Sequence, residues 1–178
     1  MAQIEEQSIE TTRDGAVTAA EFRAACALFP TGVTVVTRLL PDASPSGMTV
    51  SSFTSVSLEP PLILVCIDKR ASFLIRVVKG LTFAVNVLRE DQEPLAIRFS
   101  TSPEDGRFSG VHWAEGPHRV PLLSDCVAAF ICTLDQCVEA GDHFVLIGAV
   151  QEIRRDEGRA LVWCESGYHC LPAPADRL

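Results

Sequence analysis

The chain has 178 residues, 47% of them apolar and 21% charged, so it has the composition of an ordinary globular domain with a real core. Its formal net charge of −8 argues against nucleic acid or an anionic membrane as a partner. No apolar stretch reaches the ~20 residues that span a bilayer, and the acidic N-terminus has no signal peptide core. We therefore expect a cytoplasmic protein, with residues 1–16 as a flexible tail and residues 17–178 as one domain.

The first predicted element is a short amphipathic helix over Ala19–Phe29. Thr18 and Glu21 have the reciprocal spacing of a capping box. Four apolar residues then recur at helical spacing: Phe22, Ala25, Cys26 and Phe29. After this helix, the β-branched segment Val33–Thr37 predicts a strand and Pro41–Gly47 predicts a turn.

The segment from Gly47 to Ile67 is the most informative part of the chain. Residues 47–57 predict one strand with hydroxyl groups on both faces: Thr49, Ser51, Ser52, Thr54, Ser55 and Ser57. The apolar run Leu62–Ile67 is typical of a buried strand. A row of hydroxyls beside a buried strand is suited to hold a polar ligand, and an edge strand that faces water has the same pattern.

The rest of the chain predicts two more helices and a series of short strands. The helices are Ala71–Lys79, with Ser72 as its cap, and Asp91–Phe99, with Pro94 in its first turn. A loop is expected over Thr101–Arg119. The strands are Thr82–Leu88, Val127–Val138, His143–Ile153, Ala160–Trp163 and Tyr168–Leu171. Short strands joined mostly by hairpins predict a mainly β, antiparallel barrel.

The chain lacks the motifs of ordinary catalytic sites. It has no GxSxG, HExxH, P-loop or GxGxxG motif, so a Rossmann dinucleotide site is excluded. The seven cysteines show no zinc-site spacing and the four histidines are scattered, so no metal site is expected.

Two polar patches remain beside the hydroxyl strand. The first, Asp68–Ser72, offers backbone N–H groups, a hydroxyl and two cations, which suit a phosphate group and also suit a solvated loop. The second is Gly141-Asp142-His143. Its first two residues suit a turn, and His143 then begins a strand, where it can face the mouth of a pocket.

Together, and in this order, these segments resemble the short-chain flavin reductases, the small reductase components of two-component flavin-dependent monooxygenases. The resemblance covers residues 20–171. It rests on Phe29–Thr37, Gly47–Leu62, Phe83–Leu88, Gln92, Arg98–Phe99 and Gly141–His143. It implies an antiparallel split β-barrel with a few short peripheral helices, assembled as a homodimer with flavin near the interface.

The resemblance also implies an activity. Members transfer hydride from NADH or NADPH to FMN or FAD, and the reduced flavin serves a separate monooxygenase. No second basic cluster is evident for a 2′-phosphate, which favours NADH. Three alternatives stay open: a reductase of another acceptor, such as a corrinoid or a ferric complex, through bound flavin; a non-catalytic flavin-binding module; and a purely structural dimerisation domain.

The motifs carry the expected site residues onto this chain. The flavin ring and ribityl chain would meet Thr31, Val33, Met48, Thr49, Val50, Ser51 and Ser52. The flavin phosphate would lie against Asp68, Lys69, Arg70, Ala71 and Ser72. Phe99 would flank the pocket, His143 would orient the nicotinamide, and Tyr168 would border the same site. In place of the more usual Leu-Val-Tyr-His pattern near the C-terminus, this chain has Trp163 and Cys164, which leaves the contacts at this end open.

Overall fold

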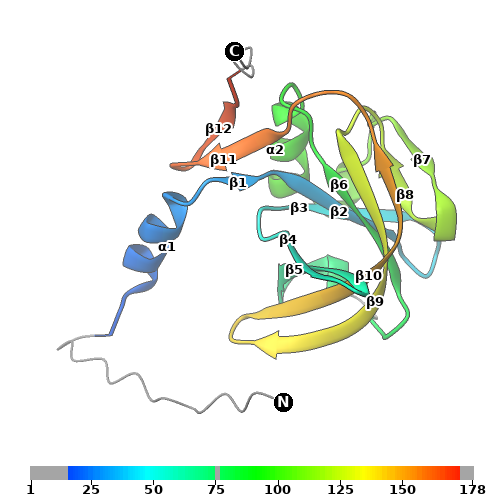
Figure 1. Cartoon of the computed structure of the whole chain (residues 1–178), viewed down its shortest axis with the longest axis horizontal. Helices are drawn as coiled ribbons and strands as arrows, with labels where there is room; N and C mark the ends of the chain where they lie inside the picture. The colour runs from blue at the N-terminus through cyan, green and yellow to red at the C-terminus, as the bar shows by residue number, and fades with distance from the viewer. Residues whose placement is uncertain (1–15, 75–76, 173–178) are drawn as a thin grey trace.

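The computed structural model describes residues 16–74 and 77–172, which fold mainly into antiparallel β-sheets (Figure 1). The strands are β1 (Thr31–Gly32), β2 (Thr34–Leu39), β3 (Pro45–Val50), β4 (Thr54–Leu58), β5 (Pro61–Asp68), β6 (Thr82–Val87), β7 (Trp113–Glu115), β8 (Pro121–Leu123), β9 (Ala128–Ala140), β10 (His143–Arg155), β11 (Leu161–Cys164) and β12 (Gly167–Cys170). The helices are α1 (Ala19–Ala27) and α2 (Glu93–Thr101), with 3₁₀ turns η1 (Ser72–Leu74), η2 (Glu104–Gly106) and η3 (Pro117–Arg119).

A seven-stranded sheet in the order β3-β2-β6-β9-β10-β5-β4 forms the body of the molecule. Its two edge strands, β3 and β4, are consecutive in the chain and are separated only by residues 51–53. The sheet therefore curls until its edges lie near one another. The connection between them is fastened to β5, because the Ser52 hydroxyl donates to the Cys66 carbonyl (3.1 Å) and accepts from the Cys66 N–H (2.9 Å). Within the described residues no backbone ladder pairs β3 with β4, so the sheet is not a closed barrel. The fold is mainly β and antiparallel.

A second sheet, β1-β11-β12, extends from one end of the large sheet. The Val33 N–H donates to the Leu161 carbonyl (3.0 Å), and the Leu161 N–H donates to the Leu88 carbonyl (2.9 Å), so β11 is fixed to the start of β2 and the end of β6. The short pair β7-β8 covers another part of the body (Figure 1). These connections bring β1 and the start of β2, from the first part of the chain, next to β11 and β12, from the last part.

The core has two main clusters of buried side chains. The larger lies inside the curled sheet and includes Val36, Val65 and Phe83, and the second lies under α2 and includes Phe99. A Cβ at Gly47 would lie 2.9 Å from the Phe99 ring, so only glycine lets β3 approach α2 this closely.

Helix α1 confirms the predicted capping box, because the Thr18 hydroxyl accepts from the Glu21 N–H (3.2 Å) and the Glu21 carboxylate accepts from the Thr18 N–H (2.9 Å). Yet none of its residues is buried. It stands away from the sheets (Figure 1) and is attached at its C-terminal end, where the Glu165 N–H donates to the Ala27 carbonyl. Its apolar side is therefore largely uncovered within the described chain: Phe22 is 63% exposed, and Phe29, two residues after the helix, is 72% exposed.

The prediction of a single strand over residues 47–57 is wrong. Thr49 lies on β3 and Thr54, Ser55 and Ser57 lie on β4, at opposite edges of the large sheet, while Ser51 and Ser52 lie in the connection between the two strands. β3 begins at Pro45, so the predicted turn Pro41–Gly47 ends earlier than expected. The apolar run in β5 is buried on one face only, because Ile63, Val65 and Ile67 alternate with half-buried residues.

The prediction of a helix over Ala71–Lys79 is also wrong. Only the 3₁₀ turn η1 forms, and residues 75 and 76 lie outside the described residues. The chain then runs to β9, where the Gly80 N–H donates to the Leu134 carbonyl and the Leu134 N–H donates to the Leu81 carbonyl. These tertiary bonds, with the β-branched Val77 and Val78, override the local preference.

The other predicted elements form with small shifts. α2 begins at Glu93 with Pro94 in its first turn, and the five remaining strands appear within three residues of their predicted bounds. Strands β7 and β8 were missed: β7 lies inside the expected loop Thr101–Arg119 and β8 follows it. The expected tail, residues 1–16, falls outside the described residues except for Ala16. Within the described ranges no helix is long and apolar enough to cross a membrane.

Candidate functional site

A pocket of about 280 Å³ opens where β3, the end of α2 and the sheet β1-β11-β12 meet. Its lining residues are Val33, Thr49, Ser51, Ser100, Trp163 and Tyr168. All six are uncharged, and they combine hydroxyl groups with two aromatic rings. A pocket of this kind suits a flat ring with a polar edge, because rings pack against aromatic faces and hydroxyls satisfy edge atoms.

One wall is held by the contact between β3 and α2. The Thr49 hydroxyl donates to the Ala96 carbonyl in α2 (2.6 Å). Ser100 lies one helical turn after Ala96 and therefore faces the same pocket. Phe99 does not reach the pocket surface: it is fully buried, packs edge-to-face on Phe108 at 4.9 Å, and supports the wall from behind.

The opposite wall is aromatic. Trp163 and Tyr168 face each other across β11 and β12 in an edge-to-face contact, with ring centroids 4.7 Å apart. Burial raises the pKa of the Tyr168 hydroxyl, so this group stays neutral at neutral pH. Thr31 pairs with Trp163 between β1 and β11. The Thr31 hydroxyl oxygen is shielded from solvent and has no hydrogen-bond partner among the described residues.

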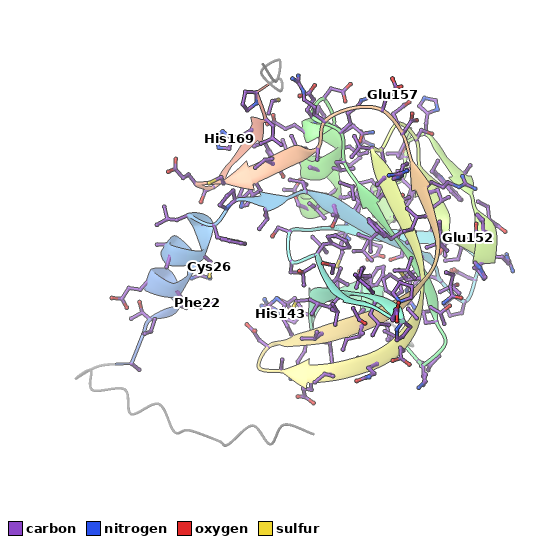
Figure 2. The ribbon with its side chains drawn as sticks, viewed as in Figure 1. Phe22, Cys26, His143, Glu152, Glu157 and His169 are labelled. Atoms are coloured by element: carbon purple, nitrogen blue, oxygen red, sulfur yellow. The ribbon has the colours of Figure 1, made fainter. Side chains whose placement is uncertain are left out.

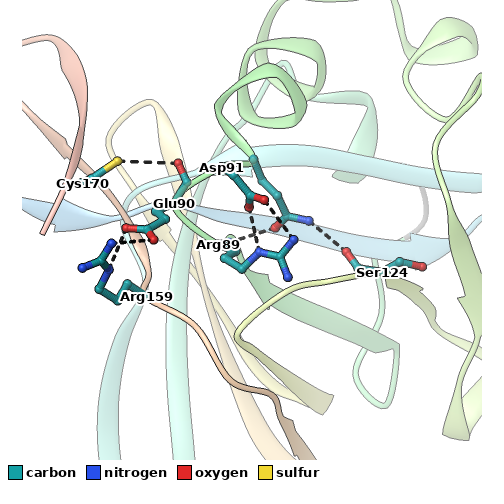
Figure 3. Close-up of polar contacts among 7 residues, drawn as sticks. Arg89, Glu90, Asp91, Ser124, Arg159 and Cys170 are labelled. Carbon is teal, nitrogen blue, oxygen red and sulfur yellow. Dashed lines mark hydrogen bonds and ion pairs between the residues drawn. The ribbon is translucent and has the colours of Figure 1, made fainter. Parts of the chain in front are cut away.

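A polar network fixes the two walls relative to each other (Figure 3). Glu90, at the end of β6, forms a two-bond ion pair with Arg159 just before β11 (2.8 Å and 2.8 Å). Gln92, the residue before α2, accepts from the Arg89 N–H (2.9 Å) through its side chain and donates to the carbonyl of Ser124, which follows β8 (2.9 Å). The frame therefore sets the distance between the helix and the aromatic wall.

The remaining predicted ring-contact residues surround the pocket without lining it. Val50 is buried and Met48 packs on the core, so both support β3. Ser52 uses its hydroxyl on the backbone of Cys66, whereas its neighbour Ser51 lines the pocket.

The loop Asp68–Ser72 differs in character from the pocket. Three of its N–H groups are already used: Lys69 donates to the Asp142 carbonyl, Arg70 to the Asp68 side chain, and Ala71 to the Asp68 carbonyl. The 3₁₀ turn η1 begins at Ser72 in place of the expected α-helix. The side chains that the loop offers an anion are the Lys69 ammonium, the Arg70 guanidinium and the Ser72 hydroxyl.

Both cations of this loop have acidic partners. Arg70 donates to Asp68 through Nε (3.1 Å) and Nη2 (2.7 Å), and this guanidinium holds the Asp68 pKa far below its usual range. Lys69 forms an ion pair with Glu139 and lies over the Phe144 ring, 5.6 Å from its centroid. The region is thus a charged and solvated surface, in contrast to the neutral pocket.

His143 begins β10 directly opposite Asp68, so the loop and the β9–β10 turn lie side by side. Gly141 provides the left-handed conformation (φ 58°) that this turn requires. The Asp142 carboxylate lies 2.7 Å from His143 Nδ1, and this contact lowers the Asp142 pKa. Because an ionised carboxylate can only accept, Nδ1 carries the proton and Nε2 is left for a ligand. Figure 2 shows His143 on the side that faces α1.

The chain connects the pocket to this charged loop over a short distance. Ser51 lines the pocket, Ser52 is bonded to Cys66, and Asp68 lies two residues further along β5. Two residues of a strand span about 7 Å. A ligand with a ring in the pocket and a phosphate on a short chain can therefore reach both regions.

Two pocket residues were missed by the sequence analysis as ligand contacts, Ser100 and Trp163. The signal for Ser100 was its place next to Phe99 at the end of a predicted helix. Trp163 stood out only as a departure from the family's C-terminal pattern, and its place in the pocket wall depends on pairing with Thr31 across the chain. In the described part of the chain, no group of three or more His, Cys, Asp and Glu residues is placed to hold a metal.

The fold and this pocket define a class: small, mainly antiparallel β-proteins with a neutral, partly aromatic pocket beside their sheet. The family profile of the flavin reductase like domain matches residues 26–172. The chain therefore belongs to the flavin reductase like family, and the resemblance found in the sequence is confirmed.

Individual relatives agree with this assignment. The chain is 40% identical over 159 residues to "Flavin reductase (NADPH)" of Lentzea aerocolonigenes, covering 88% of this chain and 92% of that protein. It is 37% identical to "Flavin-dependent monooxygenase, reductase subunit HsaB" of Rhodococcus jostii, covering 93% and 90%. The NADH:FAD oxidoreductase SgcE6 of Streptomyces globisporus, solved with NAD and FAD fragments, superposes with a TM-score of 0.81 at 36% identity, covering 88% of this chain and 94% of that one.

Other relatives are longer than this match. The chain spans 63% of the length of "Stachydrine N-demethylase reductase subunit Stc3" and 47% of a "Probable flavin reductase", both of Rhizobium meliloti, at 40% identity.

Proposed function

We propose that this protein is an NAD(P)H:flavin oxidoreductase that transfers hydride from NADH or NADPH to FMN or FAD. We further propose that the reduced flavin serves a separate monooxygenase. The observation that carries this proposal is the neutral, partly aromatic pocket within reach of two cations. Relatives named as flavin reductases with NADH or NADPH, and as reductase components of monooxygenases, support it.

The residues of the pocket fit a flavin. Beside the pocket, opposite Trp163, the solvent-shielded Thr31 hydroxyl has an unused hydrogen bond, which the polar edge of an isoalloxazine ring would satisfy. Ser51 and Ser100 offer further neutral donors, and Trp163 and Tyr168 offer aromatic packing. When bound, the flavin supplies the redox chemistry by accepting a hydride from the reduced nicotinamide. This explains why the chain needs no nucleophile or triad.

The chain's own residues bind, orient and exclude water. The hydroxyls of the pocket meet the ring edge without a fixed charge, and Val33 and the aromatic wall exclude water from its face. Lys69, Arg70 and Ser72 take the flavin phosphate through side-chain contacts, with Asp68 and Ala71 shaping the loop. His143, fixed by Asp142, presents Nε2 to the carboxamide of the nicotinamide and orients it.

The finer features of the fold and assembly belong to the same proposal. The curled sheet would be the split β-barrel of the family, and residues 17–178 would form one domain. The exposed apolar side chains of α1 support a homodimer, since an isolated nine-residue helix is marginal in water. We also propose a cytoplasmic location, with the thiols reduced.

Anaerobic stopped-flow mixing of the protein and NADH with FMN, and separately with FAD, tests the function. The expected result is loss of the oxidised flavin absorbance at a rate that rises with protein concentration and exceeds the rate without protein. Flavin binding with no acceleration would instead support a non-catalytic flavin module. If a corrinoid or ferric complex is reduced faster than free flavin, that complex and not flavin is the final electron acceptor.

A further inference from the structure

One ion pair joins the candidate phosphate loop to the hairpin that carries His143. Lys69 in the loop contacts Glu139 at the end of β9, and the Lys69 N–H donates to the Asp142 carbonyl across the same junction (3.0 Å). The Lys69 ammonium lowers the Glu139 pKa, so this carboxylate is ionised at neutral pH. Glu139 therefore places a negative charge beside the Lys69 ammonium, the cation that a phosphate would bind.

Lys69 is the more important of the two cations for an anion. The backbone N–H groups of residues 69–71 are already used, so binding depends on side chains. The Lys69 side chain is 32% exposed and that of Arg70 is 89% exposed. A less exposed charge is screened less by water and salt, so Lys69 exerts the stronger attraction.

We propose that Glu139 is an internal competitor of the flavin phosphate for Lys69, which keeps flavin binding weak and the flavin exchangeable. This inference rests on the proposed function and adds a regulatory residue to the same site. A phosphate that approaches Lys69 must displace the Glu139 carboxylate or sit beside it. Either way, part of the attraction to Lys69 is lost.

The competition has a functional consequence. A reductase that serves a separate enzyme must release its flavin after each reduction. A ring held by neutral contacts and a phosphate held against a competing carboxylate give a complex that forms readily and dissociates readily. Affinity differences among related complexes lie mostly in the dissociation rate, so Glu139 would act chiefly by raising that rate.

The test compares FMN with riboflavin, which has the same ring and no phosphate. Dissociation constants are measured by quenching of flavin fluorescence for the unmodified protein, Glu139→Gln and the control Asp135→Asn. Asp135 lies on the same strand and pairs with Lys79 at 3.4 Å, so its substitution changes the net charge equally at a different place. We expect Glu139→Gln to bind FMN about three- to tenfold more tightly, with riboflavin unchanged and the control like the unmodified protein.

A second variant keeps the proposal falsifiable if Glu139→Gln perturbs the hairpin. Lys69→Met should weaken FMN binding, and adding Glu139→Gln to it should then give no gain. Equal tightening of FMN and riboflavin, an unchanged FMN constant, or the same gain in Asp135→Asn would overturn the role of Glu139. These results leave the proposed function standing, whereas failure of the unmodified protein to bind riboflavin or to reduce flavin would overturn the function itself.

Discussion

The pocket and the charged loop are connected by a short stretch of β5, and they differ in charge. The pocket is lined by uncharged residues and framed by hydrogen bonds such as Thr49 to Ala96 and by the Glu90–Arg159 ion pair. The loop exposes two cations that are paired with acids. The pocket therefore selects by shape and neutral hydrogen bonding, and the loop selects by charge, which salt weakens.

The largest expected effect comes from a substitution that fills the neutral pocket. Ser51→Leu places bulk in the pocket, and we expect the dissociation constants of riboflavin and FMN to rise together by roughly 5- to 150-fold, the range that overpacking of 1–3 kcal/mol gives. Fluorescence titration measures both ligands, and thermal unfolding checks that the fold is retained. Retention of affinity for either flavin would show that Ser51 does not line the ring site.

Ser52 provides the contrast to Ser51. Its hydroxyl bonds both backbone groups of Cys66, so Ser52→Ala should lower the free energy of unfolding by about 1 kcal/mol. Its direct effect on the ring site should be small, because the hydroxyl does not line the pocket. Denaturant unfolding measures the loss. A variant of normal stability with flavin binding abolished would assign Ser52 to the ligand instead.

His143→Ala is expected to have the next largest effect, on the nicotinamide alone. Loss of one oriented hydrogen bond should raise the Michaelis constant for NADH or slow hydride transfer by up to about tenfold. Single-turnover flavin reduction separates the two. The dissociation constant of riboflavin should not change. If both nicotinamide parameters stay at their original values, His143 has no role in orienting the nicotinamide.

The smallest expected effect concerns the aromatic wall and its proton. Tyr168 is the chain's single tyrosine, so an ultraviolet titration reports this residue alone. Its raised pKa means that the folded state holds the proton more tightly than the unfolded state. Stability should therefore fall as the pH rises above about 10, the unfolded value. A titration midpoint at or below that value would contradict the half-buried position of Tyr168 against Trp163.

The sequence predicted the local features of this molecule well. The capping box of α1 needs only Thr18 and Glu21, and the strand patterns of β6, β9 and β10 need only their own residues. It failed where distant strands decide the outcome. Residues 47–57 contain no Gly or Pro after Gly47, yet the chain divides because β3 pairs with β2 and β4 pairs with β5.

The same limit applies to the site. The hydroxyl at Thr49 and the histidine at position 143 stand in recognisable motifs, and the structure places Thr49 in the pocket and His143 beside the loop. The contribution of Trp163 depends on pairing between β1 and β11, which are more than 120 residues apart. The acidic partner Glu139 of Lys69 was likewise invisible, because a charged residue at a hairpin end is ordinary in sequence.

The most direct test of the central claim is the salt dependence of binding to the unmodified protein. If the ring lies in the neutral pocket and the phosphate on the charged loop, the riboflavin dissociation constant should stay constant as ionic strength rises. That of FMN should increase several-fold between low and physiological salt. Equal salt dependence for the two flavins would contradict the division of the site into a neutral pocket and a charged loop.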